Sequence, residues 1–301
     1  MKEDITQYAK LGLVHHMLFP KSIEDETFHA DSLIELSKRN DIETFDCCLP
    51  YDKSNRNRVI EQLSNCSKEV CYALHLFPSR KISLCSLDKI EQSITRLVVA
   101  DQIEAASAIN AKGFVFVSGS DVPKNRDCAK TAFLDFTKWF ANELRKKGIT
   151  ALLEPFDRTV DKKYLYGPID ECISLIDEVS LHYDNIGIEL DMAHLPLMGE
   201  DFESSIRRCG HRIKRVHLGN CVLNDANSTW YGDKHPPICF ENGMIAESEL
   251  RIILETLLDI EYLSKANRGS LVMEMQPYPN KSAEYTIKRT MEILNKVWEQ
   301  I

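Results

Sequence analysis

Residues 187–195 read GIELDMAHL and residues 214–220 read KRVHLGN, and these two stretches decide the fold. In each, a short and mainly apolar run leads into side chains that carry chemistry: Asp191 and His194 in the first, His217 in the second. Such runs, without regular polar alternation, are typical of strands that are buried on both faces, as in parallel sheets. A buried strand that ends in an acid or an imidazole predicts a functional site at that end.

The same kind of run recurs eight times along the chain. The predicted strands are residues 11–16, 42–48, 70–77, 113–117, 150–155, 186–191, 215–219 and 270–276. Amphipathic periods lie between them, and one of these is the stripe of Ile90, Ile94, Leu97, Val98 and Ile103 at helical spacing. Strands that alternate with helices predict a parallel sheet.

At 301 residues, closure of that sheet into a single (β/α)8 TIM barrel is the economical choice, with residues 1–301 as one domain. A doubly wound open sheet is the alternative. It would usually carry a glycine-rich phosphate turn after its first strand, and residues 11–20, LGLVHHMLFP, contain no such turn.

Composition narrows the class of protein. The chain is 44% hydrophobic and carries a net charge of −9, which supports a large core and weighs against a nucleic-acid partner, since phosphate binding requires a basic face. No run approaches about 18 uncharged apolar residues, so we expect no membrane span. The start, MKEDITQYAK, predicts no secretory signal. Ten cysteines without a CxxC pair are typical of reduced thiols in a cytoplasmic protein.

The ends of the predicted strands carry a coherent set of side chains. They are, in chain order, His75, Glu154, Asp191, His217 and Glu274. We predict that His75, at the end of the third strand, contacts the substrate. In a barrel the carboxyl ends of the strands meet at one face, where the chemistry lies. A buried carboxylate there is costly unless it is paired, protonated or bound to a cation.

Three carboxylates and one imidazole on the last four strands predict one divalent metal ion. Glu154, Asp191, His217 and Glu274 form an oxygen-rich set that suits Mn²⁺ first, with Co²⁺, Mg²⁺ and Zn²⁺ as alternatives. The alternative for any single acid is one half of a structural ion pair. Glu189 and Arg215 lie two residues before Asp191 and His217, so the matching offsets predict an ion pair between them beneath the metal.

Five segments at these positions carry a family resemblance. They are LLEPFD (152–157), LDMAHL (190–195), KRVHLGN (214–220), YGDKHPP (231–237) and VMEMQPY (272–278). Over about residues 151–278 the chain resembles the xylose isomerase-like TIM barrels, the superfamily of sugar and sugar-phosphate isomerases and epimerases and of endonuclease IV. It is similar to the ketose 3-epimerases within that superfamily.

The resemblance implies roles for individual residues. It makes Glu154, Asp191, His217 and Glu274 the ligands of one divalent metal, and makes Glu154 and Glu274 the acid/base pair as well. It places His194 against a substrate oxygen and implies that homo-oligomers are an option. In such a site the metal stabilises an enediolate while two carboxyl groups with different pKa values move the proton. The predicted function is therefore a sugar or sugar-phosphate isomerase or epimerase.

The loop at residues 220–247 is longer than most connections and contains Asp233 and His235. We predict that both contact the substrate or support the ligands; turn capping is the alternative. Asp233-x-His235 also resembles the D-x-H of endonuclease IV, which holds an additional zinc together with the histidine matched here by His194. The fourth predicted strand, however, runs into Ser118 and supplies no histidine for a full zinc set.

Several alternatives stay open at this point. An endonuclease IV-like hydrolase, a keto-polyol dehydratase on the same metal site and a non-catalytic sugar-binding module are the other functions. Ketose epimerases usually carry an arginine beyond the metal-binding histidine, and residues 218–225, LGNCVLND, have none. The basic residues after two strands can hold a substrate phosphate or lie in solvent; they are Lys124, Arg126, Arg158, Lys162 and Lys163. His15 and His16 end the first predicted strand, and one of them is a further candidate for the pocket.

Overall fold

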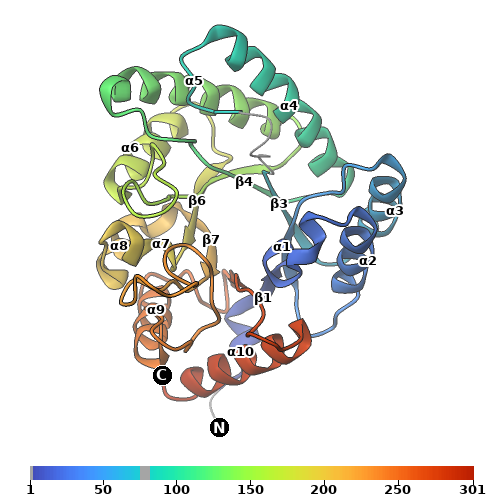
Figure 1. The fold of residues 1–301 in the computed structure, drawn as a ribbon, viewed down its shortest axis with the longest axis vertical. Helices are drawn as coiled ribbons and strands as arrows, with labels where there is room; N and C mark the ends of the chain where they lie inside the picture. Colours follow the sequence, from blue (N-terminus) through green and yellow to red (C-terminus); the bar gives the residue numbers. More distant parts are fainter. Residues whose placement is uncertain (1–2, 75–81) are drawn as a thin grey trace.

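Eight parallel strands close into a barrel in the computed structural model, which describes residues 3–74 and 82–301 (Figure 1). Each strand pairs with the next in the sequence, and β1 pairs with β8. The strands are β1 (Ala9–Val14), β2 (Thr44–Cys47), β3 (Glu69–Ala73), β4 (Gly113–Phe116), β5 (Thr150–Leu153), β6 (Ile186–Asp191), β7 (Ile213–Leu218) and β8 (Gly269–Met273). The predicted (β/α)8 barrel is confirmed; the assignment of residues 1–301 to one domain stays a prediction.

Helices surround the barrel. They are α1 (His15–Leu18), α2 (Glu26–Ser37), α3 (Lys53–Leu63), α4 (Lys89–Ala108), α5 (Arg126–Arg145), α6 (Ile169–Ser180), α7 (His194–Met198), α8 (Phe202–Cys209), α9 (Glu247–Asp259) and α10 (Ala283–Trp298). Short 3₁₀ turns lie at η1 (Ile5–Gln7), η2 (Pro20–Ile23), η4 (Pro123–Asn125) and η5 (Gly210–Arg212). Across the described residues, no helix combines the length and apolar character that a membrane crossing requires.

Local sequence explains where many of these helices begin. A side-chain oxygen accepts a backbone N–H of the first turn at five of them, which satisfies a donor that the helix leaves unpaired. The capping residues are Asp25 for α2, Asp52 for α3, Asp88 for α4, Asp201 for α8 and Ser282 for α10. Each cap fixes the direction in which the chain leaves the rim of the barrel.

The strands are buried on both faces, as their sequences predict. Every residue of β2, β4, β6 and β8 is buried, with the barrel on one side and the helices on the other. Aromatic rings fill much of the layer between β4 and α5, where the Phe114 and Phe140 ring centroids lie 5.1 Å apart. This rigid wall holds the ends of the strands in fixed positions.

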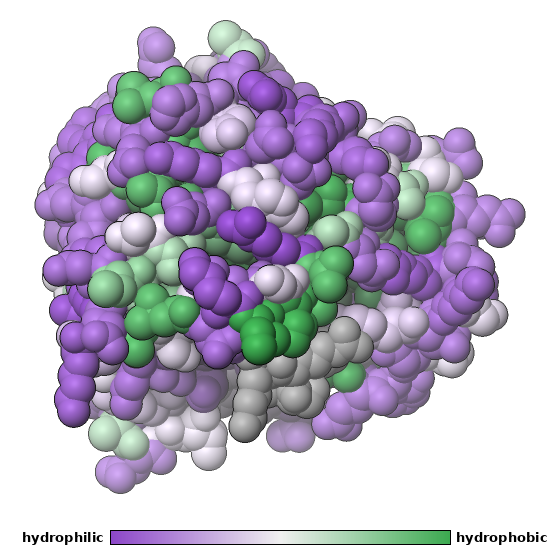
Figure 2. All heavy atoms as spheres, turned by 90° about the horizontal axis from the view of Figure 1, so that it is seen from above, coloured by the Kyte–Doolittle hydropathy of each residue, from purple (hydrophilic) through white to green (hydrophobic). Residues whose placement is uncertain are grey.

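Helix α4 differs from its sequence pattern. Of the predicted stripe, Ile103 is buried, but Ile90 and Leu97 are 73% and 74% exposed. The buried face of α4 instead carries residues such as Thr95 and Val99. Figure 2 views the molecule from the side that α4 covers and shows apolar side chains gathered within a largely hydrophilic surface. The helix was predicted correctly, and its buried face was not.

The cysteines give a direct test of this fold. No disulfide joins any of the ten, and only Cys128 and Cys239 are exposed. Burial raises the pKa of Cys48 to about 12, so its thiolate is scarce at neutral pH. We expect a disulfide reagent such as DTNB to react quickly with about two thiols of the native protein, Cys128 first, and with all ten in denaturant. A fast phase that persists in the double variant Cys128→Ser/Cys239→Ser would contradict the fold.

Candidate metal and sugar site

The four predicted metal ligands meet at the carboxyl end of the barrel. Glu154 and Glu274 directly follow β5 and β8, Asp191 ends β6, and His217 lies in β7 as its register partner. All four side chains are buried. Four successive strands therefore deliver three carboxylates and one imidazole to one place, as the order of strand ends predicts.

Their donor atoms are close enough to share one ion. One oxygen from each of Glu154, Asp191 and Glu274 can be chosen so that all three lie within 4.8 Å of one another. The Nδ1 atom of His217 lies 2.7 Å from Oε2 of Glu274. Glu154, Glu189 and His217 form a second group with the same spacing. Three carboxylate oxygens and one imidazole nitrogen suit Mn²⁺, Co²⁺, Mg²⁺ or Zn²⁺ by donor chemistry.

Backbone groups orient Asp191. Its Oδ1 accepts the N–H groups of Ala193 at 3.0 Å and Gly219 at 3.1 Å. A Cβ at Gly219 would lie 2.5 Å from this oxygen and 2.8 Å from Nδ1 of His235, so a side chain at position 219 would displace the site. The other oxygen, Oδ2, is buried without a hydrogen-bond partner. Asp191 thus presents one oxygen to the interior.

The two glutamates differ in their acidity. Burial raises the pKa of Glu154 to about 8, and the nearby Glu274 carboxylate adds to the rise. Burial acts on Glu274 in the same direction, but His235 and His217 outweigh it and hold the pKa of Glu274 below its ordinary value. Two carboxyl groups whose pKa values are pushed apart are suited to act as an acid and a base.

His194, Asp233 and His235 form a second cluster beside the first. Oδ1 of Asp233 lies 2.7 Å from Nε2 of His235 and 3.3 Å from Nε2 of His194. The same His194 atom lies 3.2 Å from Oδ2 of Asp191, which joins the two clusters. Asp191, His194 and His235 also satisfy the spacing of a metal-binding group. All three predicted contact residues of this cluster therefore reach the site.

Polar atoms at the centre of these clusters lack partners. His194 is fixed because its Nδ1 donates to the Pro155 carbonyl at 2.8 Å, and its Nε2 then faces the cluster. The buried side-chain atoms without a hydrogen bond include both oxygens of Glu189, Oδ2 of Asp191 and Nδ1 of His235. Each such atom costs about 1–3 kcal/mol unless something satisfies it. Their convergence fits a site built to bind a cation and polar ligand atoms.

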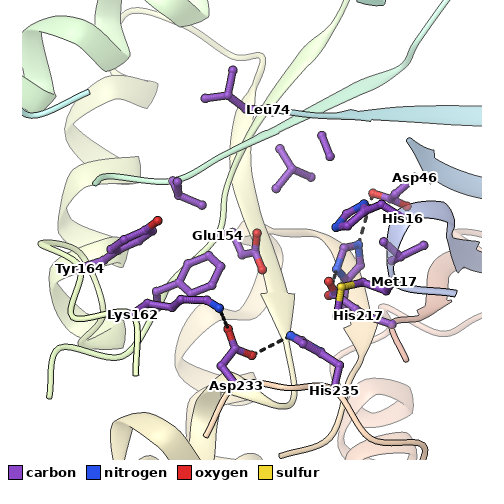
Figure 3. A pocket seen from close by; sticks show the side chains of 16 residues that line it. His16, Met17, Asp46, Leu74, Glu154, Lys162, Tyr164, His217, Asp233 and His235 are labelled. Atoms are coloured by element: carbon purple, nitrogen blue, oxygen red, sulfur yellow. Dashed lines mark hydrogen bonds and ion pairs between the residues drawn. The ribbon is translucent and has the colours of Figure 1, made fainter. Parts of the chain in front are cut away.

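A cavity of about 260 Å³ opens in front of the ligands. Figure 3 shows Glu154, His217, Asp233 and His235 around it, with Leu74 on a wall of different character. That wall is apolar and comes from the ends of β1, β3 and β4 with Val14, Ala73, Leu74, Val115 and Val117. The polar wall comes mainly from β7, from the ends of β5 and β8 and from the loops after β5 and β7, together with Asp46 of β2 and His16 of α1.

Two loops of the rim are tied together by aspartates. The carboxylate of Asp157 accepts the backbone N–H groups of Val160, Asp161 and Lys162, which shapes the loop after β5. Asp161 then accepts the N–H of Asp233 at 2.9 Å, in the loop after β7. The position of Asp233 is therefore set by the loop that carries Lys162.

Sequence reasoning missed Asp46 and Tyr164, which line the pocket. The candidates His16 and Lys162 line it as well, and the ammonium group of Lys162 lies 3.1 Å from Oδ2 of Asp233. The signal for Asp46 was a single acid within an otherwise non-acidic four-residue strand. His16 was one of two candidates, and the other, His15, instead stacks on His29 at 5.1 Å. The predicted contact residue His75 lies outside the described residues.

The predicted ion pair between Glu189 and Arg215 is wrong. The two are register partners on β6 and β7, but Arg215 reaches across the barrel to Asp46 of β2, with Nε 2.9 Å from Oδ1. Glu189 lies nearest His217, 3.4 Å from its Nδ1, without a hydrogen bond. The equal spacing of Glu189 before Asp191 and of Arg215 before His217 correctly predicted that Glu189 and Arg215 lie side by side on β6 and β7. It did not predict that Arg215 pairs with Asp46.

Comparisons with known proteins show the family and the fold. Residues 34–297 match the profile of the family described as xylose isomerase-like TIM barrel, whereas no curated protein sequence gives a match. Among solved structures, the chain is similar to a D-tagatose 3-epimerase-like protein, with 16% identity, a TM-score of 0.72, and 97% and 99% of the two chains covered.

Two further solved structures share the fold. One is an AP endonuclease of family 2 from Brucella melitensis, with 16% identity, a TM-score of 0.67, and coverage of 94% of this chain and 98% of that one. The other is a D-psicose 3-epimerase from Clostridium cellulolyticum H10, with 15% identity, a TM-score of 0.66, and coverage of 96% and 95%. At these identities the likeness concerns the fold.

Glu189 provides a test of the site's electrostatics. Its side chain is fully buried, and burial raises its pKa well above the ordinary value. In metal-free protein, Glu189→Met removes a desolvated carboxyl group at similar volume, so we expect the free energy of unfolding to rise by about 1–3 kcal/mol. Urea unfolding in the presence of a chelator measures it, with Glu189→Gln as the matched polar control. Equal or lower stability of Glu189→Met would contradict this description.

Proposed function

We propose that this chain, which belongs to the xylose isomerase-like TIM barrel family, is a metal-dependent isomerase or epimerase of a small sugar. One observation carries the proposal. Glu154, Asp191 and Glu274 place carboxylate oxygens within 4.8 Å of one another at the end of the barrel, with His217 beside Glu274.

These four side chains would hold one divalent ion, for which we propose Mn²⁺ as the preferred species on the basis of its oxygen-rich ligands. When bound, such an ion stabilises negative charge that develops on substrate oxygens. Asp191 has one oxygen anchored by backbone N–H groups, so its other oxygen is pre-oriented toward the ion. Pre-orientation reduces the rearrangement that binding requires.

Glu274 and Glu154 would move the proton. With its pKa held low, Glu274 is ionised and is the group that takes a proton from the carbon beside the carbonyl. Before an ion binds, burial holds the pKa of Glu154 at about 8, far above that of Glu274, so the two groups differ in acidity, and we assign the return of the proton to Glu154. Return of the proton to the opposite face of the same carbon gives epimerisation, and return to the neighbouring carbon gives isomerisation. We assign His194, Asp233 and His235 to the substrate's hydroxyl groups.

The charges around the pocket favour an uncharged sugar over a sugar phosphate. Lys162 is paired with Asp233, as Figure 3 shows. Arg158 binds Glu171, and Arg126 binds Asp121 at 2.6 Å. Among the described residues, Lys162 is the one lysine or arginine that lines the cavity, and acids outnumber it there. A cavity of about 260 Å³ is of the size that a monosaccharide needs.

A metal-dependent hydrolase is the second candidate. The cluster of Asp191, His194 and His235 has the spacing of a further metal group, which is the observation that favours it. Against it stand the net charge of −9 and the absence of a histidine at the end of β4, where Ser118 donates to the Gly119 carbonyl. A keto-polyol dehydratase would use the same first cluster, and its product, one water smaller than the substrate, distinguishes it.

Exchange with solvent tests the proposed reaction. Metal-loaded protein is incubated with a panel of ketoses in deuterated water, and mass spectrometry with NMR locates deuterium at carbons 2 to 4. We expect exchange and a new sugar for at least one ketose. Because Glu274→Gln lacks the base, we expect its rate to fall by about 10²–10⁴-fold.

Glu61→Gln is the matched control, because it makes the same change at an exposed glutamate of α3 that does not line the cavity. Its rate should equal that of the unaltered protein. If no ketose exchanges deuterium, or if Glu274→Gln exchanges as fast as Glu61→Gln, the proposal fails.

The number of bound ions separates the two candidate functions. Asp233 is already compensated by Lys162 and by two imidazoles, so we expect about one tightly bound divalent ion per chain after dialysis. Elemental analysis of the loaded protein measures the ratio, and Asp191→Asn should lower it. A ratio of three, with zinc retained, would favour the hydrolase instead.

A further inference from the structure

Asp46 lies at the bottom of the pocket between a guanidinium group and an imidazole. It belongs to β2, across the barrel from β7, and is fully buried. Nε of Arg215 lies 2.9 Å from its Oδ1 and 3.0 Å from its Oδ2, and Nη2 donates to Oδ1 as well. Arg215 and His217 are two residues apart on β7, so both side chains point into the barrel.

The carboxylate of Asp46 also accepts a hydrogen bond from His217. Oδ2 of Asp46 lies 3.2 Å from Nε2 of the imidazole, as the dashed line in Figure 3 marks. A carboxylate only accepts hydrogen bonds, so Nε2 carries the proton of this contact. The other ring nitrogen, Nδ1, lies 2.7 Å from Oε2 of Glu274 and 3.4 Å from Oε1 of Glu189, both of them carboxylates of the metal site. By the same argument Nδ1 also carries a proton in this arrangement, and a bound ion would take the place of that proton while the Nε2 proton stays on Asp46.

We infer that Asp46 is a positioning residue for the metal site, and this inference rests on the proposed function. By accepting the Nε2 proton, Asp46 fixes both the tautomer and the ring orientation of His217, so that the Nδ1 lone pair points at the ion. Such carboxylate–histidine–metal arrangements strengthen metal binding, and loss of the outer carboxylate typically costs 10–100-fold in affinity.

Arg215 holds Asp46 in the position that this role requires, because its guanidinium group contacts both carboxylate oxygens. Arg215 is itself held by Thr44, whose Oγ1 accepts from Nη2 at 2.9 Å, and by Glu69, whose Oε1 lies 3.6 Å from Nη1. A pair that served stability alone would need no histidine, and a buried ion pair contributes little net stability.

The experiment compares two variants of this network. Asp46→Asn keeps the shape but replaces the anionic acceptor of His217 with a neutral amide. Glu69→Gln removes a carboxylate from Arg215 without touching His217. Chelator competition gives the Kd for Mn²⁺, and urea unfolding without metal gives stability. We expect Asp46→Asn to raise the Kd about 10–100-fold, and Glu69→Gln to leave it unchanged even where its stability falls.

The unaltered protein offers a readout that needs no variant. Nitrogen-15 NMR of the imidazole groups, with Zn²⁺ as the diamagnetic probe, reports which nitrogen of His217 carries the proton. We expect the proton on Nε2. A proton on Nδ1 overturns the inference, as does an unchanged Kd for Asp46→Asn. If Glu274→Gln abolishes metal binding while Asp46→Asn does not, the proposed function stands and this inference fails. If the unaltered protein binds no ion, both fail.

Discussion

Concentration of buried charge at one end of a closed barrel is the constraint on which this structure depends. Closure brings the ends of all the strands together, and the last four deliver acids and an imidazole that are buried around one cavity. Carboxylates so placed repel one another and lose hydration. The surrounding structure answers with backbone N–H groups on Asp191, an ammonium group on Asp233 and imidazoles on Glu274. Among the described residues, both oxygens of Glu189 and Oδ2 of Asp191 remain without a hydrogen bond near the place where a cation would be bound.

The sequence was sufficient for the barrel because strand burial on both faces leaves a local signature. β6 was predicted with its exact limits, and most of the other strands to within about two residues at their first residue. Helix α4 was harder, because periodicity reports a helix without saying which face has a neighbour. Ile90 and Leu97 fit the apolar spacing but lie on the outer face. Tertiary packing decides which face of α4 lies against α5 and the barrel. The spacing of apolar residues along the sequence does not contain that information.

The residues of the site could likewise be predicted only in part. Glu154, Asp191, His217 and Glu274 could be found because each follows a buried strand and neighbouring strands meet at one rim. The partner of Arg215 could not, because Asp46 lies 169 residues away and across the barrel rather than beside it. Offsets along two adjacent strands predict the level of a side chain. They do not tell which way a long guanidinium group turns inside a closed ring of strands.

The contrast between the two walls of the cavity has a consequence for how this barrel can diverge. All four proposed metal ligands come from the second half of the chain, while the apolar wall comes from the ends of β1, β3 and β4 in the first half. Substitutions at these apolar positions can reshape the space that a substrate occupies while the four proposed ligands stay in place. Asp46 is the exception in the first half, because it contacts His217. A change of substrate can therefore arise in the apolar wall while the chemistry is kept.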